Sequence, residues 1–136
     1  MKKLTLILSL FILFQACDST SAMQEPEPPK PVQELTITHH VRSFVSDKKI
    51  RAFTNDSLIA DTLDNVFDYE TTVKVGDKIR TEVTYIERSI SDVEISYTHN
   101  GDGIGGSCHA FPPYPAGATN DCGFTLTQEL YDVVTK

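Results

Sequence analysis

The feature that most constrains the fold is an alternation of apolar and polar residues with a period of two. It first appears between Leu35 and Arg42, where Leu35, Ile37, His39 and Val41 alternate with polar neighbours. This alternation predicts a half-buried β-strand. Shorter strands and polar turns are expected to follow along the chain: strands at 50–54 and 58–63, turns at 46–48 and 55–57, and a break at 64–65.

The clearest alternation lies between residues 67 and 97. Two segments each carry one apolar or aromatic face: Phe67, Tyr69, Thr71, Val73 and Val75 in the first, and Ile79, Thr81, Val83 and Tyr85 in the second. Because Gly76-Asp77 separates them, they are predicted to pair as a hairpin. Val93, Ile95 and Tyr97 repeat the pattern. About six short strands without a long helical pattern predict an all-β fold, a small antiparallel β-sandwich of the immunoglobulin-like type.

The end of the chain carries two competing patterns. Gly105-Gly106 and the cluster Pro112-Pro113-Tyr114-Pro115 predict irregular backbone. Thr125 followed by Gln128 resembles a capping box before a short helix that carries Leu130, Val133 and Val134. Alternation of Phe124, Leu126 and Gln128 instead suits a closing strand. We expect a strand that runs into a short helical turn.

The first residues of the chain have the three parts of an export signal. Lys2 and Lys3 precede an apolar run of about eleven residues, and the small residue Ala16 stands directly before Cys17. The apolar run is too short for a membrane span, which takes about 20 residues. The chain is therefore expected to be exported.

Phe14-Gln15-Ala16-Cys17 resembles the lipobox of bacterial lipoproteins, although Phe14 and Gln15 stand where Leu and a small residue are usual. The resemblance implies a signal peptide over 1–16 and a diacylglyceryl group on the sulfur of Cys17, with further fatty acylation of palmitate type. It also implies anchoring in a membrane of the bacterial cell envelope, the outer membrane being favoured, with the domain in the periplasm or at the cell surface. Ordinary secretory cleavage after Ala22 and an uncleaved anchor helix remain alternatives.

Residues 17–33 are rich in Pro and Glu, and 34–136 remain as one small domain. Proline fixes the backbone and removes hydrogen-bond donors, so 17–33 are predicted to form an extended tether without a core. A proline-rich docking motif is the alternative. The tether would hold the domain away from the lipid surface.

Three cysteines are present. If Cys17 carries the lipid, Cys108 and Cys122 remain as a pair in a compartment where disulfides persist. Bridging them would close a loop of about fifteen residues and stabilise the fold by about 3 kcal/mol. Two reduced buried thiols or a metal pair are the alternatives, and only His109 is adjacent as a further metal ligand.

The chain is acidic, with a formal net charge of -7, and loss of Lys2 and Lys3 with the signal makes it two units more negative. This balance argues against nucleic acid or an anionic bilayer surface as the main partner. An acidic surface also serves solubility alone.

No catalytic motif is present, so we expect no enzyme and no cofactor. His39 and His40 are adjacent on a predicted strand and therefore point to opposite faces, which weakens a zinc hypothesis. Asn100-Gly101-Asp102-Gly103 falls short of a calcium loop and is predicted to be a turn that tolerates left-handed backbone. The competing hypothesis is a metal-dependent or enzymatic module around His99, Asp102 and His109.

The run from Phe67 to Tyr97, with Val73-Lys74-Val75-Gly76-Asp77 and Val93-Glu94-Ile95-Ser96-Tyr97, resembles the core strands of small immunoglobulin-like lipoproteins, including MmpS-type transport accessory proteins. It covers about a third of the domain, and the Trp that follows a Leu-Pro pair in that family is absent. The resemblance implies a role in assisting an exporter.

Together these features predict a lipid-anchored envelope protein whose β-sandwich binds a protein or glycan partner. Phe111, Tyr114 and Pro115 are the candidate contacts, because a loop rich in proline and aromatic residues suits binding. The alternative is that Phe111 and Tyr114 fold back onto an open end of the sandwich. A purely structural lipoprotein is a third hypothesis.

Overall fold

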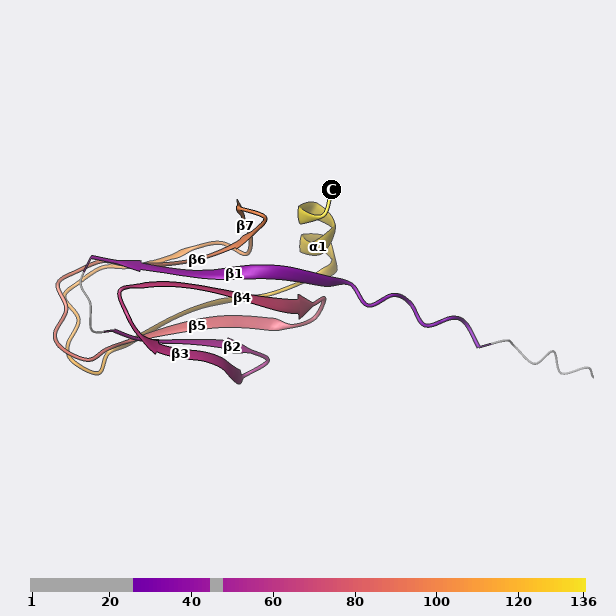
Figure 1. Cartoon of the computed structure of the whole chain (residues 1–136). Coiled ribbons are helices and arrows are strands. Elements are labelled where there is room, and N and C mark those ends of the chain that lie inside the picture. Colours follow the sequence, from indigo (N-terminus) through magenta and orange to yellow (C-terminus); the bar gives the residue numbers. More distant parts are fainter. Residues whose placement is uncertain (1–25, 45–47) are drawn as a thin grey trace, which may run out of the picture. The chain divides into compact units, whose positions relative to one another are not determined.

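The computed structural model describes residues 26–44 and 48–136 (Figure 1). The predicted signal peptide, the lipid attachment at Cys17 and the turn residues Ser46 and Asp47 lie outside the described residues. Residues 26–33 carry no helix or strand, and 26–32 are exposed. Within the described part of the chain, no helix is long and apolar enough to cross a membrane.

Two antiparallel sheets face each other and enclose the core (Figure 1). The five-stranded sheet has the order β4-β1-β6-β7, and β8 also pairs with β6. Its strands are β1 (Glu34–Ser43), β4 (Val66–Lys74), β6 (Val93–His99), β7 (Asp102–Gly103) and β8 (Cys108–Ala110). The four-stranded sheet has the order β3-β2-β5-β9, with β2 (Lys48–Thr54), β3 (Ser57–Leu63), β5 (Lys78–Tyr85) and β9 (Thr119–Thr125). The predicted two-sheet β-sandwich is confirmed.

The core lies between the inner faces of the two sheets, as the period of two predicts. The alternating residues of three strands are buried there: Leu35, Ile37, His39 and Val41 of β1, Ile79, Thr81, Val83 and Tyr85 of β5, and Val93, Ile95 and Tyr97 of β6. Successive residues of a strand point to opposite faces, so the residues between them form the outer faces.

The predicted hairpin between 67–75 and 79–85 is wrong. β4 pairs with β1, whereas β5 pairs with β2 and β9 in the other sheet. The turn at Gly76-Asp77 instead carries the chain from one sheet to the other, and the Gly76 N–H donates to the Leu126 carbonyl at 2.7 Å. The period of two shows which face of a strand is buried but not which strand is its partner. A hairpin and a sheet-to-sheet crossing therefore give the same pattern.

Hairpins form at two other turns. Asn55 and Asp56 join β2 to β3 with φ of 50° and 63°, and Asn100 and Gly101 join β6 to β7 with φ of 52° and 88°. Two successive residues with positive φ suit the right-handed twist of a two-stranded ribbon. Both segments were predicted to be turns, and the left-handed backbone at Asn100-Gly101 is confirmed.

The chain ends in a strand followed by a short helix, as expected. β9 leads into α1 (Gln128–Val134). The helix cap is Thr127, whose hydroxyl accepts from the Leu130 N–H at 3.2 Å, so the capping box predicted at Thr125 is wrong. Thr125 is instead the last residue of β9, where it is paired with Lys78. Buried Leu126 separates the end of the strand from the cap.

A disulfide joins Cys108 to Cys122, with the Cα atoms 5.9 Å apart. Cys108 begins β8 and Cys122 lies in β9, so the bridge connects the five-stranded sheet to the four-stranded sheet. The cysteines thus lie on strands, whereas irregular backbone was predicted around them. The segment 111–118 between β8 and β9 forms no regular strand, and Tyr114 makes one isolated bridge to Ser89.

Candidate binding surface

Several connections between strands meet at one end of the sandwich, here called the loop end: residues 63–66, 86–92, 111–118 and Phe44. Strand pairing sets this end, because Arg42 lies opposite Val66, Ser43 opposite Val93, and Val93 opposite Ala110. Glu34, where β1 begins, lies at the other end of the sandwich, as does α1 (Figure 1).

Exposed apolar side chains gather at the loop end. Among the described residues, nine large hydrophobic side chains are exposed, and six of them belong to the loop end: Phe44, Leu63, Val66, Ile86, Ile90 and Phe111. Phe44 is 92% exposed, Ile90 79% and Phe111 68%. Single exposed apolar residues are normal on a protein surface, whereas several at one end of a domain make that end a candidate binding surface.

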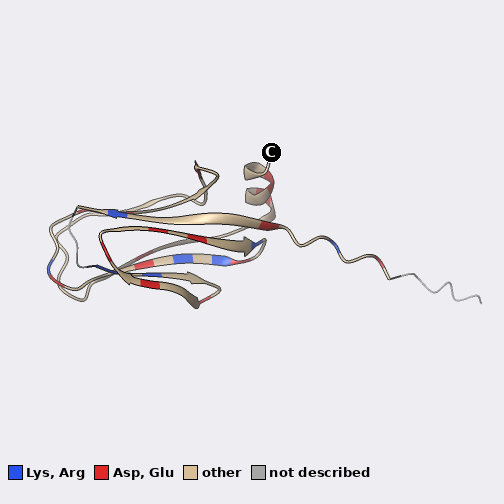
Figure 2. Ribbon diagram, viewed as in Figure 1, with Lys and Arg blue, Asp and Glu red and all other residues tan. Residues whose placement is uncertain are grey.

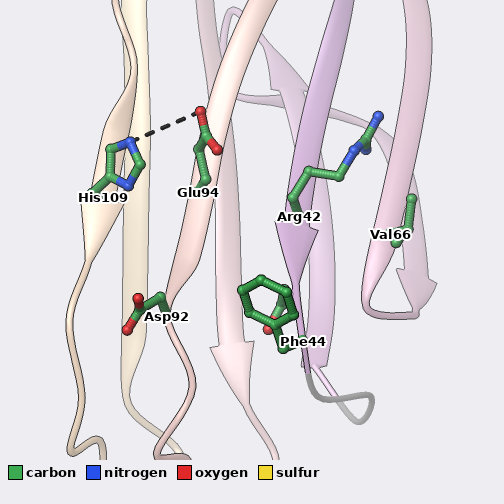
Figure 3. A pocket seen from close by; sticks show the side chains of 7 residues that line it. Arg42, Phe44, Val66, Asp92, Glu94 and His109 are labelled. Atoms are coloured by element: carbon green, nitrogen blue, oxygen red, sulfur yellow. Dashed lines mark ion pairs between the residues drawn. The ribbon is translucent and has the colours of Figure 1, made fainter.

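A hollow of about 440 Å³, here called the rim pocket, opens beside the loop end on the outer face of the five-stranded sheet (Figure 3). It is lined by Arg42, Ser43, Phe44, Val66, Asp92, Glu94 and His109. Strand register explains this set, because Val66, Arg42, Glu94 and His109 form one row across β4, β1, β6 and β8. Phe44 and Asp92 close the row on the side of the loop end (Figure 3).

The rim pocket has an excess of negative charge. Arg42 is neutralised, because its Nη2 lies 2.6 Å from Asp68 Oδ1 and its Nη1 donates to the Phe67 carbonyl at 3.1 Å. Glu94 lies 3.8 Å from His109 Nε2, which is an ion pair only when that imidazole is protonated. Asp92 adds a second carboxylate. A cationic side chain is therefore favoured in the rim pocket.

Elsewhere basic and acidic residues are interspersed rather than gathered into one basic face (Figure 2). On the outer face of the four-stranded sheet, Arg51 and Arg80 both donate to Glu82, and the Arg80 guanidinium lies 4.1 Å from the Phe53 ring centroid. These contacts join the neighbouring strands β2 and β5. We assign them to the stability of the sheet.

The three residues predicted as a binding loop take different positions. Phe111 and Pro115 are exposed, and Phe111 stacks on His109 with ring centroids 6.2 Å apart. Tyr114 folds back, since its ring stacks on Tyr85 at 4.7 Å. Phe44 and Ile90 were not predicted. Ile90 is a lone apolar residue in a polar segment, and Phe44 falls out of step with the alternation of Leu35 to Val41, so neither gives a periodic signal.

The residues of the competing hypothesis do not form one cluster. His99 Nδ1 donates to the Thr36 carbonyl at 2.7 Å, and His99 faces Asp102 across the β6–β7 pair. His109 instead faces Glu94, five residues back along β6 and about 16 Å away at 3.3 Å per residue. Among the residues that the structure describes, no group of three His, Cys, Asp or Glu side chains could hold a metal ion.

Comparison with protein-family models, with curated proteins and with solved structures finds no match for this chain. Function is therefore inferred from the geometry of the chain itself. The loop end with its rim pocket is the surface that supports partner binding best.

Proposed function

We propose that this chain is a lipid-anchored protein of the bacterial cell envelope whose β-sandwich binds a protein partner through the loop end. The observation that carries the binding proposal is the concentration of exposed apolar side chains at that end. The export signal, Cys17 in its lipobox-like sequence and the proline-rich segment 17–33 support the anchoring. Glu34, where the first strand of the sandwich begins, lies at the end opposite the loop end (Figure 1).

An immunoglobulin-like arrangement is part of this proposal. Immunoglobulin sandwiches place strands B and E in one sheet and C, F and G in the other. Here β1 and β4 pair as B and E do, β2, β5 and β9 pair as C, F and G do, and β3 takes the place of C′. β6 lies beside β1, in the place of strand A, although it comes later in the chain. In variable domains the loops at one end bind the partner, as proposed for the loop end here.

The chemistry of the loop end favours a protein surface with an apolar centre and a basic side chain. Phe44, Ile90 and Phe111 offer apolar contact area, and Asp92 and Glu94 offer carboxylates to a Lys or Arg head group. The aliphatic stem of that side chain would pack on Phe44. The net charge of -7 disfavours an anionic bilayer or nucleic acid at the same surface. A component of an exporter, as the MmpS-type resemblance implies, would be one such partner.

A photo-cross-linking amino acid placed at Phe44 or Phe111 tests the binding proposal in intact cells. We expect a discrete cross-linked protein from both positions, weakened when Asp92→Asn and Glu94→Gln are combined. Leu58 on β3 and Val133 on α1 are matched controls, because both are exposed apolar residues outside the loop end. Equal cross-linking from the controls, or a product that contains only glycan or lipid, would contradict the proposal.

Metabolic labelling with a fatty acid tests the anchoring separately. We expect label on the wild type and none on Cys17→Ala. An unlabelled wild type, or label that survives Cys17→Ala, would contradict the lipid anchor. If the partner-binding proposal is correct and the anchoring proposal is wrong, Phe44 and Phe111 should still give the cross-linked protein.

A further inference from the structure

Three side chains form a hydrogen-bonded chain on the outer face of the five-stranded sheet. His40 of β1 lies opposite Asp68 of β4, and its Nδ1 is 2.5 Å from Asp68 Oδ1. Its Nε2 is 2.7 Å from the hydroxyl oxygen of Thr98 on β6. One imidazole thus connects a carboxylate on one neighbouring strand to a hydroxyl on the other.

The protonation states follow from the partners of Asp68. Burial opposes its ionisation, but hydrogen bonds from Arg42 and His40 outweigh that effect and lower the pKa of Asp68 below its ordinary value. Ionised Asp68 only accepts, so Nδ1 of His40 carries a proton. In the neutral imidazole Nε2 then has a free lone pair, and the Thr98 hydroxyl donates to it. Carboxylate, imidazole and hydroxyl in this order activate serine nucleophiles in unrelated folds, and a threonine hydroxyl has the same reacting group.

Thr98 also lines a second open hollow of about 430 Å³. Ser96 lines it from β6, and Gly106 and Ser107 line it from the β7–β8 connection. The backbone N–H groups of Gly106 and Ser107 make no backbone hydrogen bond within the described part of the chain, and both can donate to an anionic oxygen. Thr98 thus shares an open hollow with two residues whose N–H groups make no backbone hydrogen bond in the described part of the chain.

We propose that Thr98 is the nucleophile of an acyl-transfer site that accepts small carboxylic esters, with His40 as its general base and Asp68 as the carboxylate that positions the imidazole. This activity goes beyond partner binding and does not depend on it. The site lies on strands of the sheet, which hold the three groups in register.

Each step conserves atoms and protons. The Thr98 oxygen forms a bond to the acyl carbon while His40 Nε2 takes the hydroxyl proton. The bond between the acyl carbon and the alcohol oxygen then breaks, and His40 returns the proton to the departing alkoxide, so an alcohol leaves. Water attacks the acyl-threonine with His40 as base. A carboxylic acid is released, and the proton on His40 restores the Thr98 hydroxyl.

The purified full chain with p-nitrophenyl acetate tests the proposal. We expect one acetyl group on Thr98 in a peptide map, and p-nitrophenol release that falls about 100-fold in Thr98→Val and in His40→Gln. The release of p-nitrophenol should also fall in Asp68→Asn, because an amide can hold the wrong tautomer of His40. Thr98→Ser keeps a hydroxyl and should retain activity. Thr72→Val is the matched control, because Thr72 is an exposed threonine on the same face of β4 as Asp68 but lies outside the hydrogen-bonded chain and does not line the hollow.

Acetylation confined to lysine side chains, or unchanged release by Thr98→Val, would overturn the proposal and leave the contacts as cross-strand stabilisation. Circular dichroism establishes that each variant is folded. If Thr98→Val does not fold, the wild-type peptide map decides alone: acetylated Thr98 supports the proposal, and unmodified Thr98 contradicts it.

Discussion

His39 is a polar residue whose whole side chain lies in the core. Its Nδ1 is 2.8 Å from the Thr81 hydroxyl, and its ring meets Tyr97 edge-on at 5.2 Å. Its Nε2 is buried without a hydrogen-bond partner among the described residues. Burial, and secondarily the nearby His40, lower the pKa of His39 to about 4. The core therefore holds the neutral imidazole.

This burial predicts acid destabilisation of the fold. The ordinary pKa of histidine, 6.5, applies to the unfolded chain, so between pH 6.5 and about 4 the unfolded state binds a proton that the folded state does not. The free energy of unfolding should fall by up to about 3 kcal/mol as the pH drops through that window. Urea unfolding at several pH values should show a shallower fall for His39→Gln. The same change at exposed His109 is the control, and equal pH dependence of wild type and His39→Gln would contradict the assignment.

Alanine substitutions at two neighbouring glycines distinguish the free-energy cost of a steric clash from the cost of left-handed backbone. Gly105 and Gly106 both have left-handed φ, 74° and 89°. A Cβ on Gly105 would collide with the ring of Phe124, whereas a Cβ on Gly106 would meet nothing within 4 Å. Gly105→Ala should therefore lower the free energy of unfolding by about 2 kcal/mol more than Gly106→Ala, which carries only about 1 kcal/mol of backbone cost. Chemical denaturation of the two variants measures the difference, and equal losses would show that the ring moves aside freely.

At the scale of elements, the local hydropathy pattern predicts which face of a strand is buried, whereas tertiary contacts determine which strands pair. Burial of alternate residues in β1, β5 and β6 follows from hydropathy alone, so the sequence was sufficient to predict it. The partner of β4 was mispredicted, because a strand with one apolar face can pair in either sheet. The Asp68–His40–Thr98 chain was missed for the same reason. Its members stand 28 and 58 residues apart, and only the pairing of β4, β1 and β6 brings them together.

The disulfide belongs to this scale because it connects two strands of different sheets. Replacing both cysteines, Cys108→Ala with Cys122→Ala, should lower the free energy of unfolding by about 3 kcal/mol. The chain between the bridged residues is short, with a sequence separation of 14, and the lost constraint acts mainly on the unfolded state. Urea unfolding of the wild type under reducing conditions should match the double variant. Unchanged stability in both would mean that the packing of β8 and β9 suffices without the bridge.

The whole domain has two ends of different character. Glu34 begins β1 at one end, and the exposed apolar residues gather at the other. The core residues all follow Val32. The stability of the β-sandwich should therefore be independent of everything before Val32.

Two truncations examine this independence. A chain that starts at Val32 should unfold at the same urea concentration as the full chain, because it keeps the Val75 N–H bond to the Gln33 carbonyl at 3.2 Å. A chain that starts at Thr38 loses that bond and two buried side chains, Leu35 at 4% exposure and Ile37 at 0%. Each of these contributes about 2 kcal/mol by burial, so this shorter chain should be less stable by about 4 kcal/mol or unfolded. If the chain that starts at Val32 is less stable than the full chain, the residues before Val32 stabilise the sandwich. That result would contradict the prediction that they form a free tether.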